Sequence, residues 1–307
     1  MDFAMNTSVA LHCESWSLID DVGKIDDFVI TIVITCIING LFILPALILN
    51  GIIIIAIIKT PSLRNPSNWL LSNLIFTDFL MGFLGQPLYI VINIWRVQGV
   101  LYEHCPTGIA ERIFTNILPL SLMLTLSVSS LDRYLAIRLM LQYRTTMTSF
   151  RAIIIIVTLW VFAMLCGLSL FFMGQKGFVI LLAIIFMICL LVTFVAYFKA
   201  FHGLRKHQTQ VSSPDNVSTV CINVKKYHRS FTTMLCVFLL QLLFYTPDIC
   251  AKFFSVDQTT PKSSLIATLV SDTIMYANAT LNPLFFLWRM RDVRRACKNL
   301  YKKIFRK

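Results

Sequence analysis

The sequence predicts an all-α integral membrane protein, a bundle of seven transmembrane helices followed by a short amphipathic C-terminal helix. Of its 307 residues, 57% are hydrophobic and only 14% are charged. The mean hydropathy is +0.75. A soluble domain with a charged surface does not have this composition.

The apolar residues are gathered in long stretches. A bilayer core about 30 Å thick needs about 20 consecutive apolar residues per helix. Stretches of this kind lie roughly at 28-58, 67-94, 107-140, 150-172, 177-203, 228-254 and 263-288. Their length and lack of turn residues favour spanning helices over Ile- and Val-rich strands. We expect the longest non-helical interior segment near 204-227 and a short connection at Phe172 to Gly177.

The charges predict the orientation, because Lys and Arg near helix ends stay on the cytoplasmic side. The first 27 residues carry six acids and one base, whereas nine basic residues follow Pro283. We therefore expect an extracellular segment 1-27, a seven-transmembrane domain 28-288, and a cytoplasmic amphipathic helix and tail 289-307. We expect the first helix to act as the insertion signal. The net charge of +12 then reflects topology, and nucleic-acid binding is a poor explanation of it.

Three features of the predicted surface point to covalent modification. Asn6-Thr7-Ser8 is a glycosylation sequon on the outer side. Cys13 and Cys105 are the two cysteines placed outside, and whether they are bridged stays open. Cys297 on the terminal amphipathic helix is a palmitoylation candidate, and an unmodified thiol at the membrane interface is the alternative.

Each polar residue inside an apolar stretch is expected to have a structural or functional role, because an ionised side chain at the bilayer centre costs about 2.5–3.5 kcal/mol on insertion scales. Asp78 lies deep in the second stretch, and amides that can gather around it are Asn50, Asn73, Asn278 and Asn282. This group is either an ion or water site or a set of inter-helical hydrogen bonds.

A second polar group lies toward the outer halves of the stretches: Glu111, Arg112, Asp248, Lys252 and Asp272. Its members are spaced to face a cavity that opens outward. Mutual salt bridging without a ligand is the alternative.

Several motifs at helix ends carry a family resemblance from about residue 40 to residue 300. Asp132-Arg133-Tyr134 stands at the inner end of the third stretch, with Asp78 in the second and Asn282-Pro283 in the last. Trp160 and Pro247 suit the fourth and sixth stretches. This combination resembles rhodopsin-like (class A) G-protein-coupled receptors.

The resemblance implies a receptor that converts an extracellular ligand into activation of a heterotrimeric G protein, without being an enzyme and with no catalytic residues, metal or cofactor. Arg133 would be held by Asp132 when inactive and freed when the sixth helix swings at Pro247. Residues implied in this switch are Asp132, Arg133, Tyr134, Tyr245, Pro247, Asn282, Pro283 and Phe286.

The chain departs from the family pattern at the switch and at the sodium site. Tyr245 stands where the family has Trp, Gln241 replaces Phe, and Phe286 lacks the usual Tyr hydroxyl. Leu122 replaces a hydroxyl residue of the sodium site, which argues against sodium binding.

The class of ligand can be narrowed by excluding ligands whose usual binding residues are missing. Tyr276 stands where an opsin has its retinal lysine, and Thr115 stands where monoamine receptors have an aspartate. A short, cysteine-free second outer loop is similar to melanocortin receptors and their lipid- and adenosine-binding relatives. We expect the ligand to be a small amine or a basic peptide, and a lipid-like ligand is the second alternative. The residues expected in the pocket are Glu111, Arg112, Thr115, Asp248, Lys252, Asp272 and Tyr276.

Other membrane functions remain as alternatives. A seven-helix transporter or channel would show inverted repeats or broken helices with paired acids, and neither pattern is seen in the sequence. An intramembrane enzyme would need two facing catalytic acids in a local motif. The expected location is the plasma membrane, with the lipid bilayer, a G protein and an extracellular ligand as partners.

The inner end of the sixth stretch lacks an acid. Tyr227 stands twenty residues before Pro247, where many family members restrain the arginine of the third helix with a carboxylate. Lys225, Lys226 and Arg229 cluster nearby. We therefore expect elevated signalling without a ligand.

Overall fold

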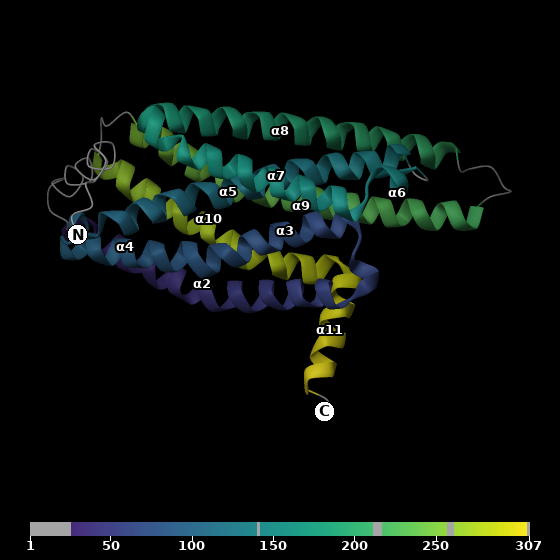
Figure 1. The fold of residues 1–307 in the computed structure, drawn as a ribbon, viewed down its shortest axis with the longest axis horizontal. Coiled ribbons are helices and arrows are strands. Elements are labelled where there is room, and N and C mark those ends of the chain that lie inside the picture. The colour runs from purple at the N-terminus through teal and green to yellow at the C-terminus, as the bar shows by residue number, and fades with distance from the viewer. Residues whose placement is uncertain (1–25, 140–141, 211–216, 257–260, 306–307) are drawn as a thin grey trace.

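The computed structural model describes residues 26–139, 142–210, 217–256 and 261–305, and within them every regular element is a helix. Long helices run side by side along one axis, and a final short helix turns away from that axis (Figure 1). The elements are α2 (Asp26–Lys59), α3 (Pro66–Leu80), α4 (Gln86–Gln98), α5 (Cys105–Leu139), α6 (Tyr143–Thr146), α7 (Ser149–Leu168), α8 (Leu170–Gln210), α9 (Val217–Val256), α10 (Pro261–Arg289) and α11 (Arg291–Phe305). The predicted seven-helix bundle with a C-terminal helix is confirmed, with α3 and α4 forming its second long member.

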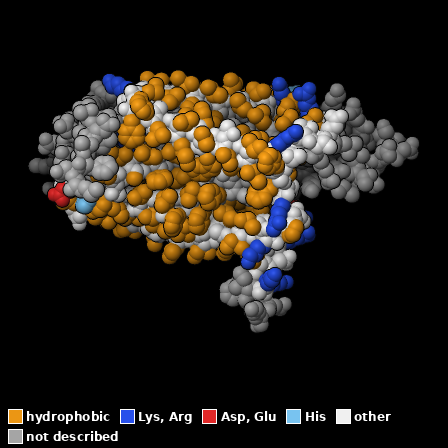
Figure 2. Space-filling model, in the orientation of Figure 1, with side chains coloured by type: hydrophobic (Ala, Val, Ile, Leu, Met, Phe, Trp, Pro, Cys, Tyr) orange, Lys and Arg blue, Asp and Glu red, His pale blue; other side chains and the backbone are white. Residues whose placement is uncertain are grey.

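The outside of the bundle is apolar. Figure 2 shows hydrophobic side chains covering the middle of the visible face, with Lys and Arg toward its ends. Among the described residues, six helices are long and apolar enough to cross a membrane. They correspond to α2, the pair α3 and α4, α5, α7, α8 and α9. α10 is not one of them, because its inward face carries buried polar side chains, including Asp272, Asn278 and Asn282.

α5 lies at the centre and contacts α3, α4, α7, α8 and α9. We call the end of the bundle that carries Arg133 and α11 the Arg133 end, and the opposite end, where α5 begins, the Glu111 end. α5 and α9 each run the length of the bundle, so each of them has residues at both ends (Figure 1).

The second long helix contains a π-helical turn, Met81–Gly85, just before Pro87. Proline has no backbone N–H and its ring clashes with the carbonyl four residues earlier, so the helix widens there. A widened turn just before Pro87 thus joins α3 to α4.

The fourth and fifth long helices are joined by a sharp turn. α7 ends at Leu168 and α8 begins at Leu170, but Ser169 between them keeps helical dihedral angles, so the helical path predicted to reach residue 172 does so. The break lies at Gly174, with φ 67° and ψ 172°. Only glycine adopts this region readily.

The prediction of a non-helical segment near 204-227 was wrong over most of its length. α8 continues to Gln210 and α9 starts at Val217. The segment is polar, but polarity alone does not end a helix in a stretch without proline or glycine between Leu204 and Ser213.

Candidate functional site

The Arg133 end is built around a buried carboxylate. Asp132 on α5 accepts hydrogen bonds from Ser67 Oγ (2.6 Å) and from the Tyr143 hydroxyl (2.5 Å). The two hydroxyl oxygens are 3.1 Å apart. Burial, and then the charge of Asp132, raise the pKa of Tyr143 well above its usual value, so its hydroxyl remains a donor at physiological pH. We call these three residues the Asp132 cluster.

Arg133 is not the partner of Asp132. Within the described part of the chain no ion pair joins the two, and Arg133 Nε is buried without a hydrogen-bond partner. Adjacent residues on a helix point in different directions, so the carboxylate faces Ser67 on α3 and Tyr143 on α6 instead. The expectation that Asp132 holds Arg133 is therefore wrong for this conformation. Tyr134 accepts a hydrogen bond from Arg138 Nη1 at 3.4 Å.

A second buried group surrounds Asp78 at mid-bundle. Asn282 Nδ2 donates to Asp78 Oδ2 at 2.9 Å, and Asp78 Oδ1 is enclosed without a partner. Both polar atoms of Asn278 and the amide oxygen of Asn282 are also enclosed without hydrogen-bond partners. One carboxylate oxygen with amide oxygens suits a hard cation or bridging water.

The other two expected amides point elsewhere. Asn50 Nδ2 donates to the carbonyls of Ala46 and Ala279, both at 2.9 Å. The carbonyl of Ala279 is the one that Pro283 leaves without its helical donor. Asn73 Nδ2 donates to Thr125, and Asn73 Oδ1 accepts from the Trp160 indole. Of the four amides, Asn282 alone makes a hydrogen bond to Asp78 in the part of the chain described.

The expected switch residues on α9 and α10 are buried beside this group. The Tyr245 hydroxyl points to Met81 Sδ at 3.7 Å, and Gln241, one turn away, has both amide atoms enclosed without partners. Phe286 is fully buried, with hydrocarbon where the family has a hydroxyl.

The Glu111 end contains a pocket between α5, α8 and α9. Side chains lining it on α5 are Thr115, Asn116, Pro119, Leu120 and Met123. On α8 they are Val179, Leu182, Ala183, Ile185, Phe186 and Cys189, and on α9 they are Tyr245, Asp248, Ile249 and Lys252. The wall formed by α8 is apolar, and the charged side chains that line the pocket, Asp248 and Lys252, belong to α9.

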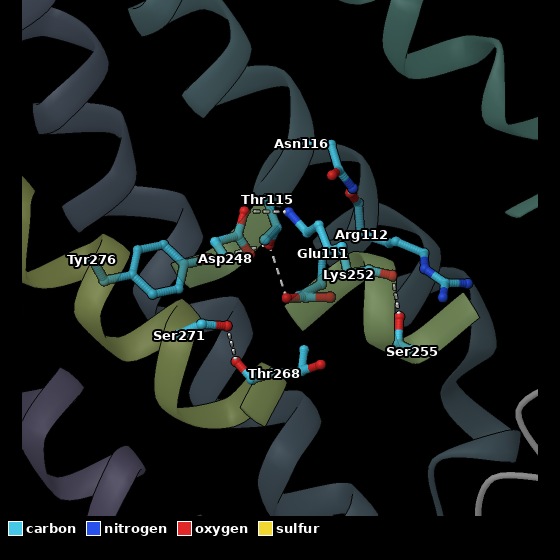
Figure 3. A network of polar contacts seen from close by, with 10 residues as sticks. All are labelled: Glu111, Arg112, Thr115, Asn116, Asp248, Lys252, Ser255, Thr268, Ser271 and Tyr276. Atoms are coloured by element: carbon cyan, nitrogen blue, oxygen red, sulfur yellow. Dashed lines mark hydrogen bonds and ion pairs between the residues drawn. The ribbon is translucent and has the colours of Figure 1, made fainter. Parts of the chain in front are cut away.

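Figure 3 shows how the polar residues of this end are connected. Lys252 Nζ bonds to Asp248 Oδ2 at 2.8 Å. The Thr115 hydroxyl donates to Glu111 Oε1 at 2.9 Å and lies 3.1 Å from the Tyr276 hydroxyl. The Arg112 side chain extends away from Asp248 and Tyr276.

Three of the seven residues expected in the pocket line it: Thr115, Asp248 and Lys252. Glu111 and Tyr276 are joined to it through Thr115, and Asp272 lies within electrostatic range of Asp248, Lys252 and Glu111. Sequence reasoning missed Asn116 and the apolar wall of α8. The sequence feature that could have indicated this part of the pocket is Pro119, a proline inside α5 that also lines it.

The modification sites are only partly described. Asn6 and Cys13 lie outside the described residues. Cys105 is disulfide-bonded. Cys297 on α11 packs against the core, and burial raises the pKa of its thiol to about 11. Its palmitoylation stays a prediction.

Comparison with known proteins places this architecture in a family. The sequence pattern described as 7 transmembrane receptor (rhodopsin family) matches residues 49–178. Rat melanocortin receptor 5 is 23% identical over 267 residues, covering 84% of this chain and 81% of that receptor. Cat 5-hydroxytryptamine receptor 1B is 30% identical over 146 residues, covering 47% of this chain and 36% of that receptor. Squid rhodopsin has the same fold, with a TM-score of 0.76, 19% identity, and coverage of 88% of this chain and 85% of its own.

The fold and these relatives define a seven-helix signalling receptor of the plasma membrane. The family match, the relatives and the fold together support a rhodopsin-like, class A G-protein-coupled receptor, a kind of protein that is not an enzyme. The likeness to a melanocortin receptor extends over most of the chain, in agreement with the similarity predicted from the short second outer loop.

Proposed function

We propose that the receptor binds an extracellular ligand in the pocket between α5, α8 and α9 and, through Arg133, activates a heterotrimeric G protein. The acid-rich N-terminal segment and the basic residues after Pro283 support an extracellular Glu111 end and a cytoplasmic Arg133 end. A small amine or basic peptide is the favoured ligand, and a lipid-like ligand comes second.

The observation that carries the proposal is that α5 and α9 each contribute to both ends. α5 supplies Thr115 and Asn116 to the pocket and Arg133 to the opposite end. α9 supplies Asp248 and Lys252 to the pocket, and Pro247 interrupts its hydrogen bonding next to them. A ligand that contacts both helices can favour one of two packings, and a shift of α9 changes what surrounds Arg133.

Arg133 is suited to meet a protein partner. Its neighbour Asp132 accepts hydrogen bonds from two hydroxyls instead, so the guanidinium is not ion-paired with it among the described residues. Five N–H donors in a planar group can bind backbone carbonyls or carboxylates of an inserted segment.

The test is nucleotide exchange on purified G proteins of each class, in membranes that contain the receptor. We expect faster exchange with at least one class, and a fall to background in Arg133→Ala. Arg295→Ala, which removes an exposed arginine of α11, is the matched control and should behave as wild type. Equal exchange by wild type and Arg133→Ala with every class would contradict the proposal.

A further inference from the structure

The pocket has a long apolar wall and a short polar edge. Val179, Leu182 and Phe186 are part of the wall on α8. The polar edge is formed by Asn116 on α5 and by Asp248 on α9, so the two residues come from different helices. Their unused hydrogen-bonding atoms define what this edge can recognise.

The amide of Asn116 has a fixed orientation. Asn116 Nδ2 donates to the carbonyl oxygen of Arg112 at 2.6 Å. A carbonyl can only accept, so the nitrogen must face it and the oxygen must point away. Asn116 Oδ1 is enclosed without a partner, and the side chain is buried, with 8% of the residue exposed. The edge therefore offers an acceptor on α5.

Asp248 offers a second acceptor on the facing helix. Its Oδ2 is occupied by Lys252 Nζ, while Oδ1 is enclosed without a donor in a residue that is 3% exposed, and the carboxyl group of Asp272 lies beside Asp248. Buried acceptors without donors cost free energy, which a ligand that supplies the donors recovers.

The neighbouring Thr115 adds no donor. Its hydroxyl hydrogen is directed to Glu111 Oε1. Pro119, four residues later, has no N–H, so the carbonyl of Thr115 also lacks its usual helical partner. The edge is thus rich in acceptors on the α5 side.

The charges disfavour an anionic head. Lys252 is the one ammonium that lines the described pocket, and it is already paired with Asp248, with Asp272 and Glu111 also in electrostatic range. A ligand carboxylate at this edge would have to compete with these acids for Lys252 and would be repelled by them.

We propose that the pocket binds an amine carried on an apolar body, with N–H donors bridging Asn116 Oδ1 and Asp248 Oδ1 and the body lying along α8. This inference rests on the proposed function and narrows its ligand class. A basic peptide fits less well, because the apolar wall leaves polar peptide groups without partners.

Binding is measured as thermal stabilisation of the purified receptor by three probes that share one apolar body: naphthylethylamine, naphthylethanol and naphthylacetate. We expect the amine to bind, the alcohol to bind about tenfold or more weakly because it carries no positive charge and only one donor, and the acid not to bind. Asn116→Leu and Asp248→Asn should each weaken the amine at least about fivefold.

Lys252→Met and Asn116→Asp separate the inference from misfolding. The first removes the cation that competes for Asp248, and the second adds an anionic acceptor, so both should bind the amine more tightly than wild type. A variant that merely unfolds cannot do so.

Three results would each overturn the inference: the acid binding best with loss of binding in Lys252→Met, amine binding unchanged in Asn116→Leu and Asp248→Asn, or no stabilisation by any probe. The proposed receptor function is judged separately, by the effect of Arg133→Ala on nucleotide exchange without a ligand.

Discussion

The Asp132 cluster shows how single side chains set the state of Arg133. Ser67 and Tyr143 satisfy both carboxylate oxygens, and this leaves the guanidinium available to a partner. Arg133 also lies within electrostatic range of the Tyr143 hydroxyl. Loss of that hydroxyl would leave a carboxylate oxygen open toward Arg133.

Tyr143→Phe should therefore lower receptor-stimulated nucleotide exchange. A net hydrogen bond contributes about 0.5–1.5 kcal/mol, which corresponds to about a two- to tenfold change in the population with Arg133 free. Exchange rates are compared at matched surface expression, with Tyr301→Phe, an exposed tyrosine of α11, as control. A rate equal to or above wild type would contradict this role of the Asp132 cluster.

Asp78 is the second residue with a specific prediction. Asp78→Asn removes the charge but can still accept the bond from Asn282. If Asp78 couples the bundle to activation through water or an ion, signalling or agonist affinity should change by about tenfold or more, because hydrogen bonds to charged groups contribute about 1.5–3 kcal/mol. Surface expression should persist. Unchanged signalling with unchanged expression would leave Asp78 a purely structural residue.

The residues that could be predicted from sequence are those whose chemistry is costly in a membrane, such as Asp78, Asp248 and Lys252. Asn116, Ser67 and Tyr143 could not be selected this way, because amides and hydroxyls are common at helix ends and within apolar helices. Their roles depend on which helix faces them, and that is set by packing.

At the scale of elements, the bundle depends on a sharp break near the start of α8. Gly174 is held at φ 67° and ψ 172°, and no atom lies within 4 Å of where a Cβ would be. Any cost of a side chain there is therefore conformational. The sequence predicted both helices and a short connection at Phe172 to Gly177, but it did not single out Gly174 within that connection, because glycine also occurs freely within membrane helices.

Gly174→Ala should destabilise the protein by about 1–3 kcal/mol. Gly40→Ala is the matched control, because Gly40 is inside α2 and its nearest neighbour to a new Cβ would be at 3.9 Å. That control should be neutral or stabilising by up to about 1 kcal/mol. Thermal unfolding in detergent measures both. Equal stability of the two variants would mean that the backbone at Gly174 accommodates a side chain without strain.

At the scale of the whole molecule, the sequence contains no acid from Asn216 to Pro247 that could restrain Arg133 from α9. The side chain of Tyr227 lies outside those described, so this prediction rests on sequence. Removing an exposed ion pair shifts an equilibrium by roughly 0.2–1 kcal/mol, which raises a minor active population by up to about fivefold.

We therefore expect ligand-free nucleotide exchange above that of Arg133→Ala, and a reduced rate in Tyr227→Glu. The measurement uses matched surface expression and all G-protein classes. Basal exchange no greater than that of Arg133→Ala would rule out elevated activity, and an unchanged Tyr227→Glu rate would rule out the missing restraint as its cause.

The central claim is that one bundle couples the pocket at the Glu111 end to Arg133 at the other. Such coupling is reciprocal, so a G protein that binds the active state must raise the affinity for an agonist by the same factor, typically about 5–150-fold. The direct measurement is the affinity of a pocket probe for the purified receptor with and without nucleotide-free G protein, in wild type and in Arg133→Ala. We predict a several-fold gain in wild type and none in Arg133→Ala; the same affinity in all four conditions would contradict the account.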